Sequence, residues 1–234
     1  MQWLYLAVNL GAVSVPFLFS FHAKIRFYKQ WLALAVAIFS TAAFFLVWDN
    51  IFTGLGVWGF SNDYILGIRF GHLPLEEVLF FICIPYACTF TAFCLQQLFW
   101  TGKFTKPLPA FTTVVAVGLL IVGILFNQKL YTFYTFLFTA LFLFFMRNRL
   151  RVADYYTYLI LLIPFFIVNG ILTGTGIDSE VVWYNDNENL GIRMLTIPVE
   201  DTIYGMLLIL SNIAIFRAVS NQLQFRSTSI QPVL

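Results

Sequence analysis

The chain has 234 residues, of which 60% are hydrophobic and only 10% are charged. A soluble domain carries about 25% charged residues, so this composition excludes a water-soluble protein and indicates an integral membrane protein. The formal net charge of +2 is small and the basic residues are scattered, which excludes a nucleic-acid-binding surface.

Seven apolar stretches approach the roughly 20 residues that a helix needs to cross a bilayer. They are predicted near residues 3–21, 31–48, 75–99, 108–126, 131–146, 155–172 and 199–217. Backbone groups cannot stay unpaired in lipid, so an all-α fold with seven transmembrane helices is expected. The first stretch has no basic segment before it and no small-residue cleavage site, so we expect a retained span rather than a signal peptide.

Charged residues between these stretches predict the orientation. If the N-terminus lies outside, the basic residues expected inside are Lys24, Arg26, Lys29, Lys103, Lys106, Arg147, Arg149, Arg151, Arg217 and Arg226. The basic residues left outside are Arg69, Lys129 and Arg193. Because cytoplasmic loops carry an excess of Lys and Arg, we expect the N-terminus outside and the C-terminus in the cytoplasm.

Two segments of the chain repeat each other. "IFTGLG" (51–56) matches "ILTGTG" (171–176) at an offset of 120, and "GIRFGHLPLEE" (67–77) matches "GIRMLTIPVED" (191–201) at an offset of 124. Each copy is a helix, an irregular outer segment and a helix that begins at Pro-x-Glu-acid. The pattern predicts one structural domain with a parallel 3+1+3 duplication: a first repeat over 1–99, a linker helix within 100–130 and a second repeat over 131–234. The functional site of such folds commonly lies between the halves.

The repeated motif places two adjacent acids in the first turn of each helix, namely Glu76, Glu77, Glu200 and Asp201. One interpretation is that they cap free N–H groups or interact with the helix dipole, each worth about 0.3–1 kcal/mol. The other is catalytic, because acids at membrane depth are costly and usually functional. Adjacent helical positions point about 100° apart, so one acid can face the centre while its neighbour bonds an arginine or a loop N–H.

Two further pairs share repeat positions. Arg69 corresponds to Arg193, and Asp49 corresponds to Asn169. The arginines either contact lipid headgroups or form ion pairs that orient the acids. The exchange of Asp for Asn indicates that the halves have diverged, so Asp49 is a second candidate proton donor.

Aromatic residues also stand beside the repeated acids. They belong to an interface belt, or they line a pocket for a cationic or polyene molecule; the candidates are Trp48, Trp58, Phe60, Trp183 and Tyr184. No Cys/His pair has zinc spacing, so no metal is expected. "GLGVWG" (54–59) fits a dinucleotide motif, but it follows a membrane helix instead of a strand, so no cofactor is expected.

"WDNIFTGLGVWGF…GIRFGHLPLEEVLFF" and "NGILTGTG…VVWYNDNENLGIRMLTIPVED" resemble the membrane-integral lycopene cyclase family. That family includes heterodimeric bacterial carotenoid cyclases, their fused single-chain forms and the cyclase domain of fungal bifunctional enzymes. The resemblance implies a fused form in a bacterial inner membrane. It also implies an isomerase (an intramolecular lyase) that converts the ψ-ends of lycopene to β-rings, giving γ-carotene and then β-carotene without flavin. Its implied partners are lycopene, other carotenoids of the bilayer and enzymes of the carotenoid pathway.

The reaction implied by this resemblance suits the repeated acids. A carboxylic acid protonates the terminal C1–C2 double bond at C2, the C5–C6 double bond attacks the cation at C1, and a base removes a proton from C6. The acid and base are expected among the four residues of the two motifs, with Arg69 and Arg193 orienting them. Whether each repeat serves one end of the substrate or both form one site stays open, as does the oligomeric state.

Two alternatives share features of the sequence. A carotenoid hydratase would deliver water to the same cation instead of closing a ring. A small-solute transporter can also have a 3+1+3 arrangement of seven helices, although transporters usually place polar groups at the bilayer midplane and not at the outer ends of helices.

Overall fold

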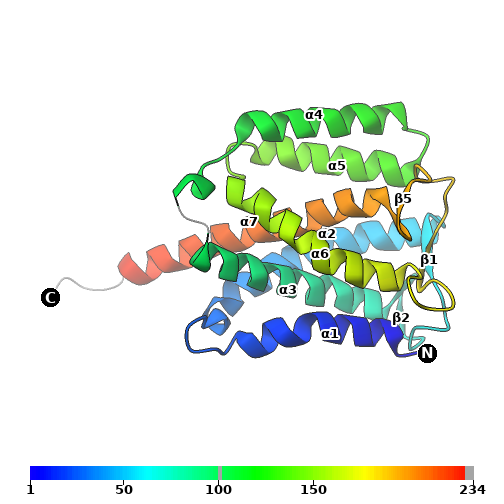
Figure 1. Ribbon diagram of the computed structural model, residues 1–234, viewed down its shortest axis with the longest axis horizontal. Helices are drawn as coiled ribbons and strands as arrows, with labels where there is room; N and C mark the ends of the chain where they lie inside the picture. The colour runs from blue at the N-terminus through cyan, green and yellow to red at the C-terminus, as the bar shows by residue number, and fades with distance from the viewer. Residues whose placement is uncertain (100–101, 230–234) are drawn as a thin grey trace.

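A computed structural model describes residues 1–99 and 102–229, with the backbone alone for 226–229. Within these residues the chain forms a bundle of α-helices that run roughly parallel to one axis (Figure 1). The helices are α1 (Leu4–Phe19), α2 (Trp31–Gly54), α3 (Leu75–Leu98), α4 (Pro109–Leu125), α5 (Leu130–Met146), α6 (Val152–Leu172) and α7 (Val199–Ser229). Two 3-10 turns, η1 (Phe27–Gln30) and η2 (Gly102–Thr105), lie in the connections.

The helices fall into two length classes. Four of them, in α2, α3, α6 and α7, are long and apolar enough to cross a membrane. The expected spans at 3–21, 108–126 and 131–146 form shorter apolar helices of 16, 17 and 17 residues. The all-helical class predicted from the sequence is therefore confirmed.

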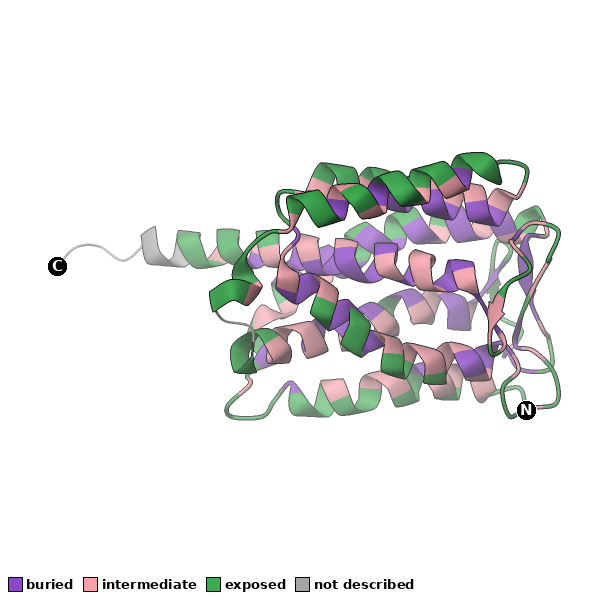
Figure 2. Cartoon of the chain, turned by 45° about the horizontal axis from the view of Figure 1, so that its top comes forward, coloured by how far each residue is buried: buried purple, intermediate pink, exposed green. Residues whose placement is uncertain are grey.

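The outer surface of the bundle is apolar. Exposed side chains include Leu10 and Val15 on α1, Val114 on α4, Phe145 on α5 and Ile163 on α6. Figure 2 shows α4 as the most exposed helix, lying over α5 at the edge of the bundle. Since a contiguous exposed apolar surface marks a protein or membrane contact, this exterior belongs in lipid, and the chain is a membrane protein.

Two helices extend beyond their predicted ends. The prediction ended the second helix at residue 48, but α2 continues to Gly54 and carries Asp49 inside its last turns. The last helix was predicted to end at 217 and continues to Ser229. Neither segment 49–53 nor segment 218–229 contains Gly or Pro, so no residue there ends the helix. The Ser220 hydroxyl also donates to the Gln30 side chain. The expected boundaries at 100–101 and 230–234 lie outside the described residues.

The two segments predicted as irregular contain short strands at the end of the bundle that holds the N-terminus (Figure 1). β1 (Trp58–Phe60) pairs antiparallel with β4 (Val182–Tyr184), which joins the two repeats. β2 (Arg69–Phe70) and β3 (Leu73–Pro74) form one hairpin, and β5 (Arg193–Met194) and β6 (Ile197–Pro198) form the other. Strands of two or three residues have too little periodicity for detection in the sequence.

Gly59 permits the close pairing of β1 and β4. It stands opposite Trp183, and a Cβ on residue 59 would lie 2.3 Å from Cζ2 of that indole ring. No larger residue fits between the strand and the ring. Glycine is therefore required where the first repeat meets the second.

The repeated phrase makes the same turn in both halves. Gly67 and Gly191 have φ angles of 83° and 70°, a region that glycine enters without strain. Each helix that follows is tied back to its loop, because the Leu75 amide donates to the Ile68 carbonyl and the Val199 amide donates to the Ile192 carbonyl. Likewise α1 packs on α3 as α5 packs on α7.

A buried ion pair closes the opposite end of the bundle. The Arg217 guanidinium on α7 donates to both carboxylate oxygens of Asp154 on α6, at 2.8 and 3.0 Å. Asp154 also accepts the Arg151 amide at the start of α6. The pair is shielded from solvent, with 15% and 6% of the two side chains exposed.

We expect Asp154→Ala to lower the free energy of unfolding by roughly 3 kcal/mol, because it leaves Arg217 buried without its partner. Thermal unfolding in detergent measures the change. Asp186→Ala is the matched control, since Asp186 pairs with Arg193 at the same 2.8 Å but its side chain is 58% exposed. Exposed pairs contribute about 0–1 kcal/mol, so equal losses in both variants would contradict the assignment.

Candidate active site

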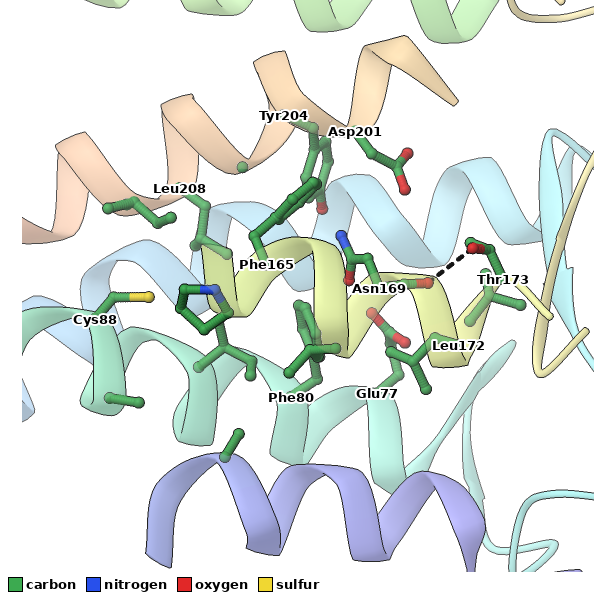
Figure 3. A pocket seen from close by; sticks show the side chains of 18 of the residues that line it. Glu77, Phe80, Cys88, Phe165, Asn169, Leu172, Thr173, Asp201, Tyr204 and Leu208 are labelled. Carbon is green, nitrogen blue, oxygen red and sulfur yellow. Dashed lines mark hydrogen bonds between the residues drawn. The ribbon is translucent and has the colours of Figure 1, made fainter. Parts of the chain in front are cut away.

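A pocket of about 250 Å³ lies between the two repeats and reaches the strand end of the bundle. Its walls come from α1, α2, α3, α5, α6, α7 and the strands β1 and β4. Most lining residues are apolar or aromatic, as Figure 3 shows for Phe80, Phe165, Leu172 and Leu208. Ligand pockets are typically apolar with a few placed polar groups, which is the composition found here.

The pocket collects one acid from each repeated motif. Glu77 of α3 and Asp201 of α7 line it from different helices (Figure 3). Asp49 of α2 and its repeat partner Asn169 of α6 line it as well. Glu77 and Asp201 are far apart in the sequence, and so are Asp49 and Asn169. The fold brings all four side chains to the boundary between the two repeats.

The other acid of each motif supports the loop before its helix. Oε1 of Glu76 accepts the Leu66 amide at 2.7 Å, and Oε1 of Glu200 accepts the Leu190 amide at 2.8 Å. Both acids are fully buried and do not line the pocket. Of the four acids predicted as catalytic candidates, only Glu77 and Asp201 line the pocket, because neighbouring helical positions diverge by about 100°.

Tyrosine hydroxyls bind the two pocket acids. Tyr5 on α1 donates to Oε2 of Glu77, and Tyr131 on α5 donates to Oδ1 of Asp201 at 2.5 Å. Tyr184 on β4 donates to the second oxygen of Asp201 at 2.9 Å. Tyr5 and Tyr131 were not predicted as site residues. The signal was present, since "LY" begins the first helix of each repeat at Leu4 and Leu130.

Asp49 adds a third carboxyl to the first repeat's side of the pocket. It is buried, and its Oδ1 accepts the Trp58 indole N–H at 2.6 Å. Glu77 lines the same pocket as Asp49. Oδ2 of Asp49 has no hydrogen-bond partner among the described residues.

Three of the five predicted aromatic residues line the pocket: Trp58, Phe60 and Tyr184. Trp183 does not, because successive residues of a strand face opposite sides and Val182 and Tyr184 face inward. Trp183 instead packs on Gly59 with 41% of its surface exposed.

Trp48 also lies outside the pocket lining. It is the helical neighbour of Asp49 and points to a different side of α2, where it packs in an aromatic cluster with Phe138 and Tyr204. In this structure Trp48 packs against other rings, and it does not line the pocket.

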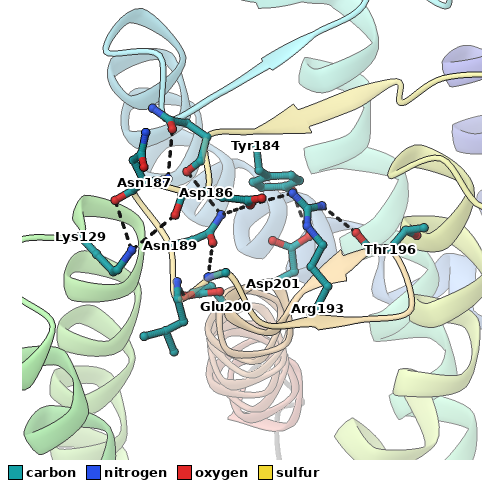
Figure 4. Close-up of polar contacts among 12 residues, drawn as sticks. Lys129, Tyr184, Asp186, Asn187, Asn189, Arg193, Thr196, Glu200 and Asp201 are labelled. Carbon is teal, nitrogen blue, oxygen red and sulfur yellow. Dashed lines mark hydrogen bonds and ion pairs between the residues drawn. The ribbon is translucent and has the colours of Figure 1, made fainter.

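The two arginines do not bond any of the four motif acids. Arg69 donates to the Asn62 side chain and the His72 carbonyl. Arg193 donates to Asp186 and the Thr196 carbonyl, as Figure 4 shows. The hydrogen bonds of both arginines therefore hold the outer loops, and neither arginine orients a motif acid by a direct bond. Arg193 still lies 6.0 Å from the centre of the Tyr184 ring, whose hydroxyl binds Asp201.

The outer loop of the second repeat forms a polar network around Asp186 (Figure 4). Hydrogen bonds from Asn189 and from the Arg193 guanidinium hold the pKa of Asp186 below its usual range. Asn189 is buried and its Oδ1 accepts the Gly191 amide. The network therefore sets the shape of the turn that leads to Glu200 and Asp201.

The arrangement provides carboxyl groups on two sides of an apolar, aromatic-lined space. Such a site can donate a proton, accept one elsewhere and stabilise a carbocation against aromatic faces. In the described part of the chain, no group of three or more His, Cys, Asp or Glu side chains is placed to hold a metal ion.

The division between loop-binding and pocket-lining acids predicts different amide exchange. Glu200→Ala removes the acceptor of the Leu190 amide, so we expect that amide to exchange about 10-fold faster or more, as the loss of a buried bond worth about 1–3 kcal/mol requires. Hydrogen–deuterium exchange by mass spectrometry measures it. Asp201→Ala is the control and leaves this bond intact; equal acceleration in both variants would contradict the division.

Comparison with known proteins identifies the family. The family model described as lycopene cyclase matches residues 2–95 and 128–219, most of the chain. A 66-residue segment is 33% identical to the bifunctional lycopene cyclase/phytoene synthase of Pyrenophora tritici-repentis, and it covers 28% of this chain and 11% of that protein. No solved structure gives a significant match. With the family model covering both halves that build the pocket, the chain belongs to the lycopene cyclase family.

Proposed function

We propose that the chain is a lycopene β-cyclase that converts the ψ-ends of lycopene to β-rings, through γ-carotene to β-carotene. The observation that carries the proposal is the placement of Glu77 and Asp201, one from each repeat, in one apolar pocket lined by aromatic rings. Family membership supports the substrate class. The reaction rearranges bonds within one molecule, so it is an isomerisation without net redox change.

The chemistry requires a protonated acid, an ionised base and a site that excludes water. A carboxylic acid adds a proton to C2 of the terminal double bond and leaves a cation at C1. C6 of the C5–C6 double bond then bonds to C1, the cation moves to C5, and loss of the C6 proton forms the ring double bond. Aromatic faces such as those of Trp58 and Phe60 stabilise the cation in each step.

The hydrogen bonds support a division of roles between the two sides. Asp201 accepts two hydroxyl donors, from Tyr131 and Tyr184, and such bonds favour an ionised carboxylate that can accept the C6 proton. Glu77 and Asp49 line the same pocket, and two carboxyls held near each other keep a proton between them because both cannot ionise cheaply. We therefore assign the proton donor to the Glu77–Asp49 pair and the base to Asp201.

A parallel 3+1+3 duplication accounts for the frame that carries these residues. The two matched segments of the family model leave out residues 96–127, which contain α4, the proposed linker helix. On this basis all seven helices cross the membrane, the three shorter ones included. We further propose that the protein resides in a bacterial plasma membrane, where it takes lycopene from the bilayer beside other enzymes of the carotenoid pathway.

Expression of the chain in lycopene-accumulating bacteria tests the proposed function. We expect γ- and β-carotene by chromatography and absorption spectra; hydroxylated products would indicate a hydratase, and unchanged lycopene with protein in the membrane would contradict cyclase activity. Glu77→Gln and Asp201→Asn should each lower conversion roughly 10²–10⁴-fold, because each removes a positioned proton-transfer group.

The matched control for these variants is Asp178→Asn, an exposed carboxyl of the same outer loop that does not line the pocket. Its conversion should stay within about twofold of the unchanged chain, as is usual for surface substitutions. Protein levels in the membrane are measured for all variants. Full turnover in both Glu77→Gln and Asp201→Asn would refute the assigned acid and base.

The proposed orientation places the strand end outside and the Lys24 loop in the cytoplasm. Asp178→Cys should react with a membrane-impermeant maleimide in intact cells, whereas Lys24→Cys should react only after lysis. The unchanged chain, with Cys83 and Cys88 buried, sets the background labelling. Labelling of Lys24→Cys alone in intact cells would reverse the orientation.

A further inference from the structure

The pocket continues from the acids into a long groove. Glu77 and Thr91 both line it and lie about four turns apart on α3, a distance of roughly 21 Å along the helix. Ala12 and Pro16 of α1 line one side, and Pro164 and Phe165 of α6 line the other. Its shape is that of a narrow channel with the carboxyls at one end.

This groove is open to the lipid side of the bundle. Pro164 is exposed, and Ala12 and Pro16 are only partly buried, although all three line the space that contains Glu77. The side chains at these positions of α1 and α6 are small or ring-closed, and they border the pocket. A hydrophobic chain dissolved in the membrane can enter the pocket here without crossing water.

A second groove occupies the equivalent position in the other repeat. It lies between α2, α5 and α7 and has a volume of about 260 Å³. Its residues match those of the first groove through the repeat: Phe138 and Phe142 correspond to Ala12 and Pro16, as Tyr131 corresponds to Tyr5, and Phe44 and Phe45 correspond to Pro164 and Phe165.

The second groove does not reach the acids. No carboxyl lines it, and aromatic rings stand between it and the pocket. Ring centres lie 5.5 Å apart for Phe44 and Phe138, 5.1 Å for Trp48 and Phe138, and 4.9 Å for Trp48 and Tyr204. At the positions equivalent to Phe44, Trp48 and Phe138 the first groove carries Pro164, Val168 and Ala12, which have no aromatic ring, whereas the equivalent of Tyr204 is Phe80.

We propose that a carotenoid reaches the acids by one route only, the groove between α1, α3 and α6 (the open groove), and that the repeats build one site and not two. The aromatic cluster of Phe44, Trp48, Phe138 and Tyr204 closes the equivalent route. The proposal rests on the proposed function, because it takes a linear carotenoid as the occupant.

A single route has a consequence for a substrate with two identical ends. A conjugated polyene is stiff, and a narrow groove of this volume cannot turn it end for end. After the first ring forms, the molecule therefore leaves through the open groove and returns with its other end toward Glu77 and Asp201. γ-Carotene is then a released product and a substrate in its own right.

Matched substitutions on the two faces of α1 test the route. Ala12→Phe introduces into the open groove the side chain found at the equivalent position 138, and we expect conversion of lycopene to fall about 10-fold or more, since misplacement by about 1 Å can cost about 100-fold. Val15→Phe on the exposed side of α1 is the control and should stay within about twofold. Equal losses in Ala12→Phe and Val15→Phe would overturn the proposal.

Measurement of free γ-carotene tests the release step on the unchanged chain, independently of any folding defect in Ala12→Phe. The protein in liposomes receives ¹³C-lycopene with unlabelled γ-carotene. We expect labelled γ-carotene to accumulate outside the protein. We also expect unlabelled γ-carotene to be converted to β-carotene in competition with the labelled lycopene. Labelled β-carotene formed without free labelled γ-carotene would overturn the proposal.

The two proposals fail in different ways. If the unchanged chain converts no lycopene, the proposed function is refuted. The route is then tested by binding: lycopene should copurify with the unchanged chain and should not copurify with Ala12→Phe. If the unchanged chain is active and Ala12→Phe, present at equal level in the membrane, is equally active, the route alone falls.

Discussion

Carboxyl groups buried among membrane helices need hydrogen-bond donors, and the fold is arranged around that need. Each repeat buries two acids at the start of a helix: one accepts a backbone amide of the preceding loop and the other accepts a tyrosine hydroxyl from a neighbouring helix. A buried polar group without such a partner costs several kcal/mol in an apolar medium. The loop shape and the positions of α1 and α5 beside α3 and α7 follow from these contacts.

The duplication brings the acids together, and divergence gives them different surroundings. Asp201 is held by two tyrosines, whereas Glu77 shares its surroundings with Asp49, whose counterpart in the second repeat is the neutral Asn169. A strictly symmetric pair would offer two acids of equal strength. The proposed proton-initiated cyclisation needs a donor and an acceptor at the same time, and the loss of symmetry would supply both.

The same divergence shapes access from the membrane. Ala12, Pro16 and Pro164 line one groove, and Phe138, Phe142 and Phe44 stand at the equivalent positions of the other. Tyr204 of this aromatic cluster also lines the pocket, where its ring centre lies 6.3 Å from that of Trp58. Closing one groove therefore adds aromatic surface next to the place where a cation would form, and it removes a path along which water could reach that cation.

Much of this protein could be predicted from local patterns in its sequence. Apolar runs of nearly 20 residues demand helices in lipid, and the repeated "GIRFGHLPLEE" and "GIRMLTIPVED" identified the helices that carry the acids and the family they resemble. Tertiary structure decided what adjacency alone leaves open. Helical rotation sent Glu77 and Asp201 into the pocket and Glu76 and Glu200 to the loops, and strand alternation turned Tyr184 inward and Trp183 outward. The roles of Tyr5 and Tyr131 depend on contacts between segments far apart in the sequence. Tyr5 and Glu77 are separated by 72 residues, and Tyr131 and Asp201 by 70. Contacts at such separations leave no local pattern in the sequence.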